Sequence, residues 1–139
     1  MYRHILVPVD LSDRNHPTLE TAVDLARIHD GKVTVLHVIE TIQHMDFDES
    51  REFFALLEEK AKKKIRELMA PWDDDEISIK AELRYGKPVK EIVMFSVTNR
   101  CDLIVLSSHR VDVQEMSRGL GTVSHQVAYF AQTPVLLVK

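Results

Sequence analysis

One stretch decides the fold: Leu103-Ile104-Val105-Leu106-Ser107-Ser108-His109-Arg110, an apolar run that opens directly into small and basic residues. Ten residues further on come Gly121-Thr122 and the start of a short amphipathic segment. In α/β proteins, a buried strand that ends in this way and leads to a Gly-Thr helix start is typical of an anion pocket. The hydroxyl, the backbone N–H groups and the helix dipole all favour negative charge there. The sequence therefore predicts a phosphate-binding pocket.

Other apolar runs extend this reading to the whole chain. Residues 5–9, 33–39, 103–106 and 135–138 are almost continuously apolar, which indicates strands buried on both faces in a parallel sheet. Residues 77–83 instead alternate between apolar and polar, which indicates an edge strand with one wet face. We expect a helix to bury the apolar set, which is Ile77, Ile79, Ala81 and Leu83. We expect the polar set to be exposed, which is Ser78, Lys80 and Glu82.

Four helices are expected between these strands. The first covers residues 18–29, with Pro17 in its first turn and Gly31 as its stop, and the second covers residues 49–69 before Pro71. The third follows Gly86 with Pro88 in its first turn, and the fourth begins near Thr122. The residues with helical spacing that we expect to face inward are Leu19, Ala22, Val23 and Ala26; Phe53, Leu57, Ala61, Ile65 and Leu68; Val89, Ile92, Val93, Ser96 and Val97; and Val123, Val127 and Phe130.

This alternation of strand and helix predicts an α/β fold. Right-handed crossovers give a three-layer, doubly wound, Rossmann-like domain with a five-stranded parallel sheet in the order 3-2-1-4-5. Such sheets bind ligands beyond the carboxyl ends of their strands, where the winding reverses. The reversal lies between the first and fourth strands, which end in Pro8-Val9-Asp10 and in residues 107–110. The anion motif and the topology therefore point to one crevice.

The composition of the chain indicates how many domains it forms, which partners it can bind and in which compartment it resides. With 139 residues, 45% of them hydrophobic, the chain fits one domain over residues 1–139. A net charge of -4 argues against nucleic-acid binding, and the four lysines within residues 60–64 fit a solvated helix face. The single cysteine, Cys101, excludes an intramolecular disulfide and is expected to be a half-buried, inert thiol. Because no apolar run reaches about 20 residues, and the N-terminal one is too short for a signal peptide, we expect a cytoplasmic protein with no membrane contact.

The residues give little support for catalysis or for a resident metal. The histidines other than His109 show no metal-ligand spacing, and His37 fits a satisfied core histidine. The chain contains no Gly-x-Ser-x-Gly elbow and no Gly-x4-Gly-Lys-Ser/Thr loop. We therefore expect a protein that is not an enzyme, with at most slow ATP hydrolysis.

Taken together, these fragments resemble the universal stress protein family over the whole chain. The resemblance is carried by residues 5–12, by Val35-Leu36-His37-Val38, by Gly86-Lys87-Pro88 with Glu91-Ile92, by Asp102-Leu103-Ile104-Val105 and by residues 134–138. Nucleotide-binding members carry Gly-x2-Gly-x9-Gly-Ser/Thr after the fourth strand. Here Ser107 and Arg110 stand at the first two glycines, and ten residues precede Gly121-Thr122.

The altered loop changes how phosphate would be held. A glycine allows a positive φ and lets a backbone N–H approach a phosphate closely. Arg110 offers instead charge-assisted hydrogen bonds whose geometry suits a phosphate. The resemblance then implies that ATP, ADP or AMP binds, with or without Mg²⁺.

The family's contacts can be carried over position by position. Asp10 and Val38 resemble the adenine and ribose neighbours, with Pro8 and Val9 shaping the strand end. The ribose and phosphate contacts correspond to Ser107, Ser108, His109, Arg110, Gly121, Thr122 and Val123. Structural explanations stay open for three of these residues: Asp10 as the cap of the following loop, Val38 as core and Thr122 as an N-cap alone.

Three functions of different classes remain. The first is a stress-response binding or regulatory protein whose nucleotide occupancy tunes its partner interactions. The second is a nucleotide-free, homodimeric interaction module, and the third is a nucleotidyl-transfer enzyme, disfavoured because His-x-Gly-His is absent. Family members commonly pair through the last strand, so the resemblance implies a homodimer with contacts at Pro134, Val135 and Leu137.

Overall fold

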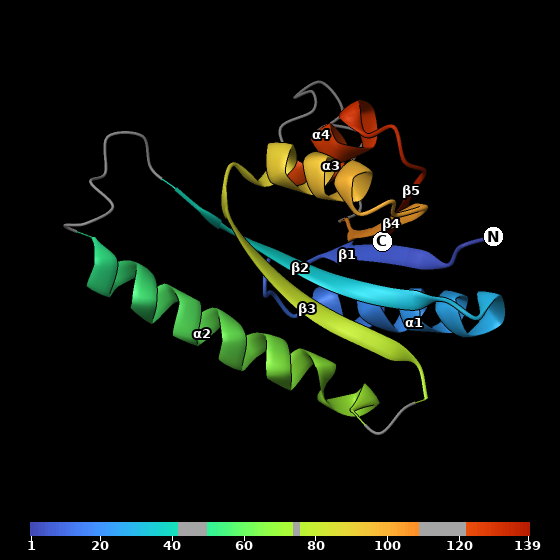
Figure 1. The fold of residues 1–139 in the computed structure, drawn as a ribbon, viewed down its shortest axis with the longest axis horizontal. Coiled ribbons are helices and arrows are strands. Elements are labelled where there is room, and N and C mark those ends of the chain that lie inside the picture. The colour runs from blue at the N-terminus through green and yellow to red at the C-terminus, as the bar shows by residue number, and fades with distance from the viewer. Residues whose placement is uncertain (42–49, 74–75, 109–121) are drawn as a thin grey trace.

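The sheet has the strand order that the sequence predicts. The computed structural model describes residues 1–41, 50–73, 76–108 and 122–139 (Figure 1). Its strands are β1 (His4–Pro8), β2 (Lys32–Glu40), β3 (Ser78–Gly86), β4 (Leu103–Ser107) and β5 (Val135–Val138). They form a five-stranded sheet in the order β3-β2-β1-β4-β5, and all four strand pairs are parallel. The predicted α/β fold, with its switch between β1 and β4, is therefore confirmed.

Helices cover both faces of this sheet. They are α1 (Asn15–His29), α2 (Arg51–Met69), α3 (Pro88–Thr98) and α4 (Val123–Phe130), with a short 3-10 helix η1 (Ala70–Trp72) after α2. Helices α1 and α2 lie on one side of the sheet, and α3 and α4 lie on the other (Figure 1). These three layers bring the starts of α1, α3 and α4 to the edge where the strands end.

Two hydrophobic clusters hold the layers together. On β1, Ile5 and Val7 belong to the cluster under α1, whereas Leu6 belongs to the cluster under α3 and α4. All three side chains have 0% exposure, because a strand that is covered on both faces needs apolar residues at every position. Burial of each stabilises the fold by about 1.5–3 kcal/mol. The central strands are thus fixed from both sides.

The end of α1 differs in detail from the expectation. Asp30, not Gly31, takes the left-handed conformation that ends the helix, with φ of 54°. Gly31 is needed for another reason: a Cβ there would lie 2.6 Å from the Tyr2 carbonyl oxygen. The helix also begins at Asn15, three residues before the predicted start, which places α1 close to the end of β1.

Several expected inward positions on the helices are wrong. On α2 the buried aromatic residue is Phe54, whereas Phe53 is 50% exposed, because Phe54 packs edge-on against Tyr85 of β3. On α3 Phe95 is buried and Val97 is 54% exposed. On α4 only Val127 of the three predicted residues is buried. Hydrophobic spacing alone does not resolve which of several neighbouring apolar residues on a helix is buried.

The edge strand β3 is less buried than predicted. Ile77, Ile79 and Leu83 are half-buried, but Ala81 is exposed; Ser78 and Lys80 are exposed as expected, and Glu82 is half-buried. Residues of α2 and β3 pack against the same hydrophobic cluster, but the small Ala81 side chain lines a groove between the two elements.

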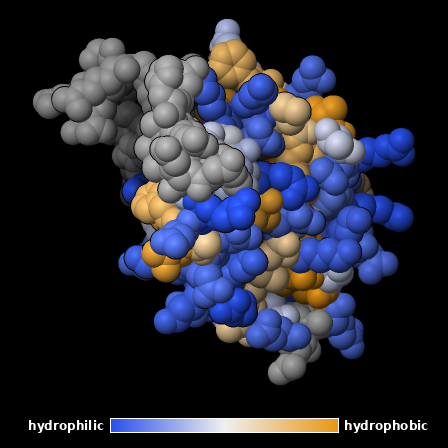
Figure 2. Space-filling model, turned by 60° about the vertical axis from the view of Figure 1, so that its left-hand side comes forward, coloured by the Kyte–Doolittle hydropathy of each residue, from blue (hydrophilic) through white to orange (hydrophobic). Residues whose placement is uncertain are grey.

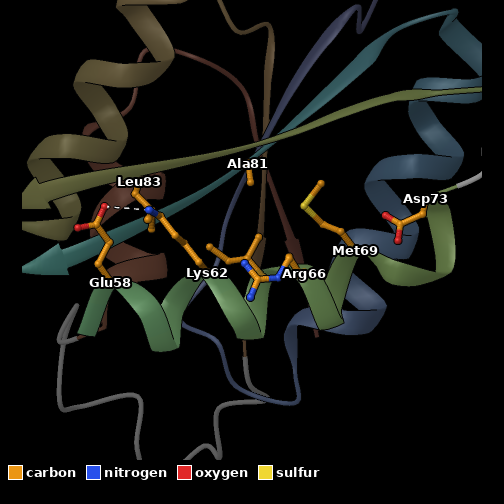
Figure 3. A pocket seen from close by; sticks show the side chains of 8 residues that line it. Glu58, Lys62, Arg66, Met69, Asp73, Ala81 and Leu83 are labelled. Carbon is orange, nitrogen blue, oxygen red and sulfur yellow. Dashed lines mark ion pairs between the residues drawn. The ribbon is translucent and has the colours of Figure 1, made fainter. Parts of the chain in front are cut away.

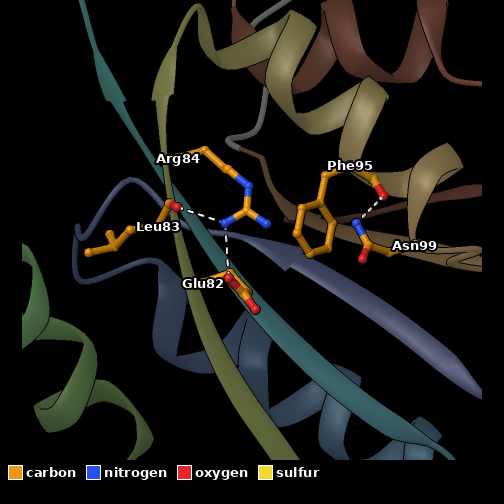
Figure 4. Close-up of polar contacts among 5 residues, drawn as sticks. All are labelled: Glu82, Leu83, Arg84, Phe95 and Asn99. Atoms are coloured by element: carbon orange, nitrogen blue, oxygen red, sulfur yellow. Dashed lines mark hydrogen bonds and ion pairs between the residues drawn. The ribbon is translucent and has the colours of Figure 1, made fainter.

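Polar and aromatic contacts join β3 to its neighbours. The Arg84 guanidinium donates to Glu82 Oε2 and to the Leu83 carbonyl, both at 2.9 Å, and lies 5.2 Å from the centre of the Phe95 ring of α3 (Figure 4). On the opposite face, the Tyr85 hydroxyl donates to Glu58 of α2 at 2.9 Å. Contacts on both faces thus join β3 to α2 and α3.

The surface is hydrophilic over most of the face shown in Figure 2, and its hydrophobic side chains form small separate groups. The described part of the chain contains no helix that combines the length and the apolar character needed to cross a membrane.

Candidate functional site

A cleft of about 480 Å³ lies at the carboxyl ends of the central strands. Its walls come from the ends of β1, β2 and β4 and from the starts of α1, α3 and α4. The lining residues are Pro8, Val9, Asp10, Arg14, Asn15, Leu36, His37, Val38, Glu40, Pro88, Ile92, Leu106, Ser107, Ser108, Thr122, Val123 and Ser124. Its volume is within the range of small-molecule sites, and its position is where doubly wound sheets bind ligands.

Most of the predicted site residues meet in this cleft. Those that line it are Pro8, Val9, Asp10, Val38, Ser107, Ser108, Thr122 and Val123. The other three, His109, Arg110 and Gly121, lie outside the described residues. The structure therefore brings together both sides of the predicted crevice, with β1 and β2 on one side and β4 and α4 on the other.

Asp10 is held in place by the turn that follows β1. Its Oδ1 accepts a hydrogen bond from the Ser12 backbone N–H at 2.9 Å. Burial opposes ionisation, but hydrogen bonds from Ser12 and the charge of Arg14 outweigh it and lower the pKa of the Asp10 carboxyl. Asp10 thus caps the loop, as the structural explanation proposed, and also presents a fixed negative charge to the cleft.

Val38 and His37 form the wall at the end of β2. Val38 is 9% exposed and belongs to the core cluster under α3 and α4, yet it also lines the cleft. His37 Nδ1 donates to the Val9 carbonyl oxygen at 2.9 Å. This bond ties the ends of β1 and β2 together and confirms His37 as a histidine with a hydrogen-bond partner in the fold.

A buried polar cluster joins the start of α1 to the end of β4. Asn15 is 1% exposed, and its Nδ2 donates to Ser107 Oγ at 3.1 Å. Ser107 also contacts the Thr18 hydroxyl, and both hydroxyls donate to the Arg14 carbonyl oxygen, at 3.2 and 3.1 Å. The cluster fixes the backbone of Arg14 at the cleft. Ser107 therefore has a structural role here.

Sequence reasoning missed several lining residues, of which Arg14 and Asn15 matter most. A signal for them was present, because they start the helix that follows the central strand β1. The start of such a helix always faces the carboxyl end of the sheet. Because the helix was expected to begin at residue 18, neither residue was predicted to lie at the site.

The start of α4 supplies polar groups at the opposite wall. Thr122 has an extended backbone, and its Oγ1 accepts a hydrogen bond from the His125 N–H at 3.3 Å. Thr122 is thus the N-cap of α4, and Thr122 and Ser124 also line the cleft. The first backbone N–H groups of a helix have no intrahelical partner, so this end is suited to an anion.

Ser108 lies between β4, β5 and the cleft. It is 4% exposed, and its backbone N–H donates to the Val138 carbonyl oxygen at 2.8 Å, which continues the pairing of β4 with β5. Its hydroxyl accepts a hydrogen bond from Lys139 Nζ at 3.3 Å. The ammonium group of Lys139 is therefore placed beside a residue that lines the cleft.

A second groove, of about 500 Å³, lies between α2 and β3. Side chains of the helix and of the strand face each other across it (Figure 3). Its apolar part is formed by Ile65, Met69, Ala81 and Leu83, and its charged residues are of both signs, with Glu58 and Lys62 paired at 3.3 Å. Because the groove carries charges of both signs and lies at the edge of the sheet, its residues do not favour one class of ligand.

The amino end of the sheet holds a further polar cluster. His4 Nδ1 donates to the Asn99 carbonyl oxygen at 3.1 Å, and its Nε2 accepts from the Thr34 hydroxyl at 2.8 Å. Cys101 Sγ lies 3.7 Å from His4 Nδ1, but burial raises the pKa of the thiol to about 11. Cys101 is buried rather than half-buried, and its low reactivity stays a prediction. Within the described ranges, no three potential metal-ligating side chains gather in one place.

Comparison with known proteins agrees with this geometry. The family model for the universal stress protein family matches residues 1–139. The universal stress protein YxiE of Bacillus subtilis is 30% identical, and the match covers 100% of both chains. The solved structure of UspA from Lactobacillus plantarum has a TM-score of 0.83 and 26% identity, and covers 99% of this chain and 98% of that one.

Two further solved structures of the same fold are described with a ligand. A universal stress protein in complex with cAMP has a TM-score of 0.66 and 22% identity, covering 99% of this chain and 97% of that one. The universal stress protein from Archaeoglobus fulgidus in complex with dAMP has a TM-score of 0.70 and 23% identity, covering 99% and 98%. Family model, sequence relatives and fold agree along the whole chain, which therefore belongs to the universal stress protein family.

Proposed function

We propose that this protein binds an adenine nucleotide in the cleft at the carboxyl ends of β1, β2 and β4, and that it acts as a binding and regulatory protein. One observation carries the proposal: a cleft of about 480 Å³ joins the Asp10 wall to the capped start of α4. The first wall suits the hydroxyls of a ribose, and the second suits a phosphate.

Relatives support the choice of an adenine nucleotide. Two proteins of this fold are described in complex with cAMP and with dAMP. Both ligands combine an adenine with a sugar and a phosphate, and the sugar and the phosphate match the two walls of the cleft. We propose ATP, ADP or AMP for this chain. Mg²⁺ usually binds through phosphates and only one or two carboxylates, so we include it only as a companion of bound phosphates.

The role of Arg110 stays a prediction from the sequence, because this residue lies outside the described part of the chain. If its guanidinium holds phosphate, Arg110→Ala weakens nucleotide binding by about 1.5–3 kcal/mol, which is the value of a charged hydrogen bond. Arg110→Gly restores part of that loss, because glycine reopens the approach to the backbone. Equal affinities of both variants and the wild type would exclude the role.

Homodimerisation through β5 is the second part of the proposal. This strand forms one edge of the described sheet, and its Leu136 is 38% exposed. Proteins rarely leave an apolar edge strand open, because it can pair with another chain. We expect a dimer with contacts at Pro134, Val135 and Leu137. Light scattering that finds a monomer at micromolar concentration would remove this part.

Two measurements test nucleotide binding. The first is mass spectrometry of any ligand released from the purified protein, and the second is calorimetry with ATP, ADP and AMP. We expect Asp10→Ala to weaken binding about tenfold, through the loss of a charged acceptor. Asp73→Ala, at the groove between α2 and β3, is the matched control and should leave affinity unchanged. If the wild type gives no heat with millimolar nucleotide, the nucleotide-free interaction module becomes the better explanation.

A further inference from the structure

The charges around the cleft are unequally distributed. The two carboxylates that line it, Asp10 and Glu40, follow or end β1 and β2, and the cation among its lining residues, Arg14, precedes α1 and lowers the pKa of Asp10. The opposite side, where β4, β5 and α4 meet, contributes serine and threonine hydroxyls and the start of a helix. A nucleotide has a complementary polarity, because its phosphates carry negative charge at one end and its ribose hydroxyls and base are uncharged. Its phosphates would therefore lie on the side of β4 and α4.

Lys139 brings a positive charge to that side. The pairing of β4 with β5 places Ser107 opposite Val138, and the Ser108 N–H bonds to the Val138 carbonyl oxygen at 2.8 Å. Lys139 follows directly and reaches Ser108 Oγ with its Nζ at 3.3 Å. The strand register thus fixes the backbone of Lys139 beside Ser108, and the bond to Ser108 Oγ places its ammonium group.

The same face of the sheet also carries the start of α4. Ile104 and Leu106 of β4 belong to the cluster under α3 and α4, and Val135 and Leu137 of β5 pack against it. Because side chains alternate along a strand, Ser108 and Lys139 continue this set. Thr122 and Ser124 begin the helix that packs there, and both line the cleft with Ser108. The Lys139 ammonium and the N-terminus of α4 therefore lie on one face, at one end of the sheet.

We propose that Lys139 binds the outer phosphates of a nucleoside di- or triphosphate, and so makes affinity rise with the number of phosphates. The inference rests on the proposed function, because it needs adenosine to occupy the rest of the cleft. An ammonium is a point charge with three donors, so it can keep its bond to Ser108 and still meet a phosphate oxygen. Monophosphates, which end nearer the helix start, gain little from it.

The test uses calorimetry of the full chain with adenosine, AMP, ADP and ATP. Lys139→Gln should weaken ATP binding by about three- to tenfold, since the side chain is exposed and water screens part of its charge. Adenosine and AMP should bind as they do to the wild type. Lys139→Arg keeps the charge and should keep most of the affinity. Lys64→Gln, an exposed lysine on α2, is the matched control and should change nothing.

Salt gives an independent readout. Higher ionic strength screens an exposed charge pair, so ATP affinity of the wild type should fall more steeply with salt than that of Lys139→Gln. An unchanged ATP affinity in Lys139→Gln, or equal weakening of adenosine and ATP, overturns the inference and leaves nucleotide binding standing. If the wild type binds neither adenosine nor any nucleotide, the inference and the proposed function fall together.

Discussion

The two ends of the sheet are built in opposite ways. At the amino end, polar groups form hydrogen bonds with one another: His4 bonds to Thr34 and Asn99, and Asp102 accepts hydrogen bonds from the N–H groups of Arg3 and His4. At the carboxyl end, Asp10, Arg14, Ser108 and Thr122 border a cleft of about 480 Å³. The same strands thus carry a closed network at one end and groups directed at a cavity at the other. The first arrangement serves stability, and the second is the one to which our proposal assigns nucleotide binding.

The largest effect on stability is expected at Asp102. Its carboxylate accepts the Arg3 N–H at 2.9 Å and the His4 N–H at 3.2 Å. Asp102→Ala removes both bonds and should lower the free energy of unfolding by about 1.5–3 kcal/mol, as measured by urea denaturation. Nucleotide affinity should stay unchanged. A variant that loses affinity but not stability would reverse the assignment of the two ends.

A smaller loss of stability is expected at Thr122, together with a loss of binding. Its hydroxyl caps α4 through the His125 N–H, so Thr122→Ala should cost about 1 kcal/mol in unfolding free energy. Because the same residue lines the cleft, nucleotide affinity should fall as well. Thr122→Ser keeps the hydroxyl and is the control. If Thr122→Ala destabilises the fold without changing affinity, the residue is an N-cap alone.

His4 makes the amino end sensitive to acid. Burial lowers the pKa of this histidine, despite opposing effects of Asn99 and Asp102. The neutral ring accepts from Thr34, and protonation removes that acceptor site. Because the folded pKa is below the unfolded value of about 6.5, stability is complete above that pH and falls as the pH drops through it.

The measurement is urea denaturation at several pH values between about 7.5 and 5. His4→Gln should show a weaker pH dependence in this window than the wild type. The exposed His16, changed to Gln, is the control and should leave the dependence unchanged. A steep acid transition in His4→Gln that equals the wild type would assign the effect to another group.

The smallest expected effect is at Cys101. The thiol is 7% exposed, and burial raises its pKa to about 11. At pH 8 almost no thiolate is present, so a thiol reagent such as iodoacetamide should modify the folded protein slowly. The unfolded chain in urea should react fully. Rapid labelling of the folded protein would show that the amino end opens, contrary to the closed network described above.

Strand positions were predictable because their signal is strong and local. Most residues of β1, β2 and β4 are apolar, and such runs are typical of a parallel sheet covered on both sides. Helix faces were harder, as Phe53 and Phe54 show: adjacent aromatic residues fit the spacing equally well, and only the contact with Tyr85 chooses between them.

The candidate site was predictable where a strand ends and less so where a helix begins. Asp10, Val38 and Ser108 follow or end apolar runs and were found. Arg14 was missed because α1 begins three residues before the predicted start. Lys139 was missed because its role depends on the register between β4 and β5, which no local pattern in the sequence specifies.

The central claim is that nucleotide binds at the carboxyl end and leaves the amino end untouched. NMR spectra of the isotopically labelled protein, recorded as ATP is added, test it most directly. We predict shifts at Val9, Asp10, Val38, Ser108 and Val123, which line the cleft, and constant signals for His4, Cys101 and Asp102. Shifts confined to the amino end, or to Lys62, Arg66 and Ala81 in the groove between α2 and β3, would contradict the account.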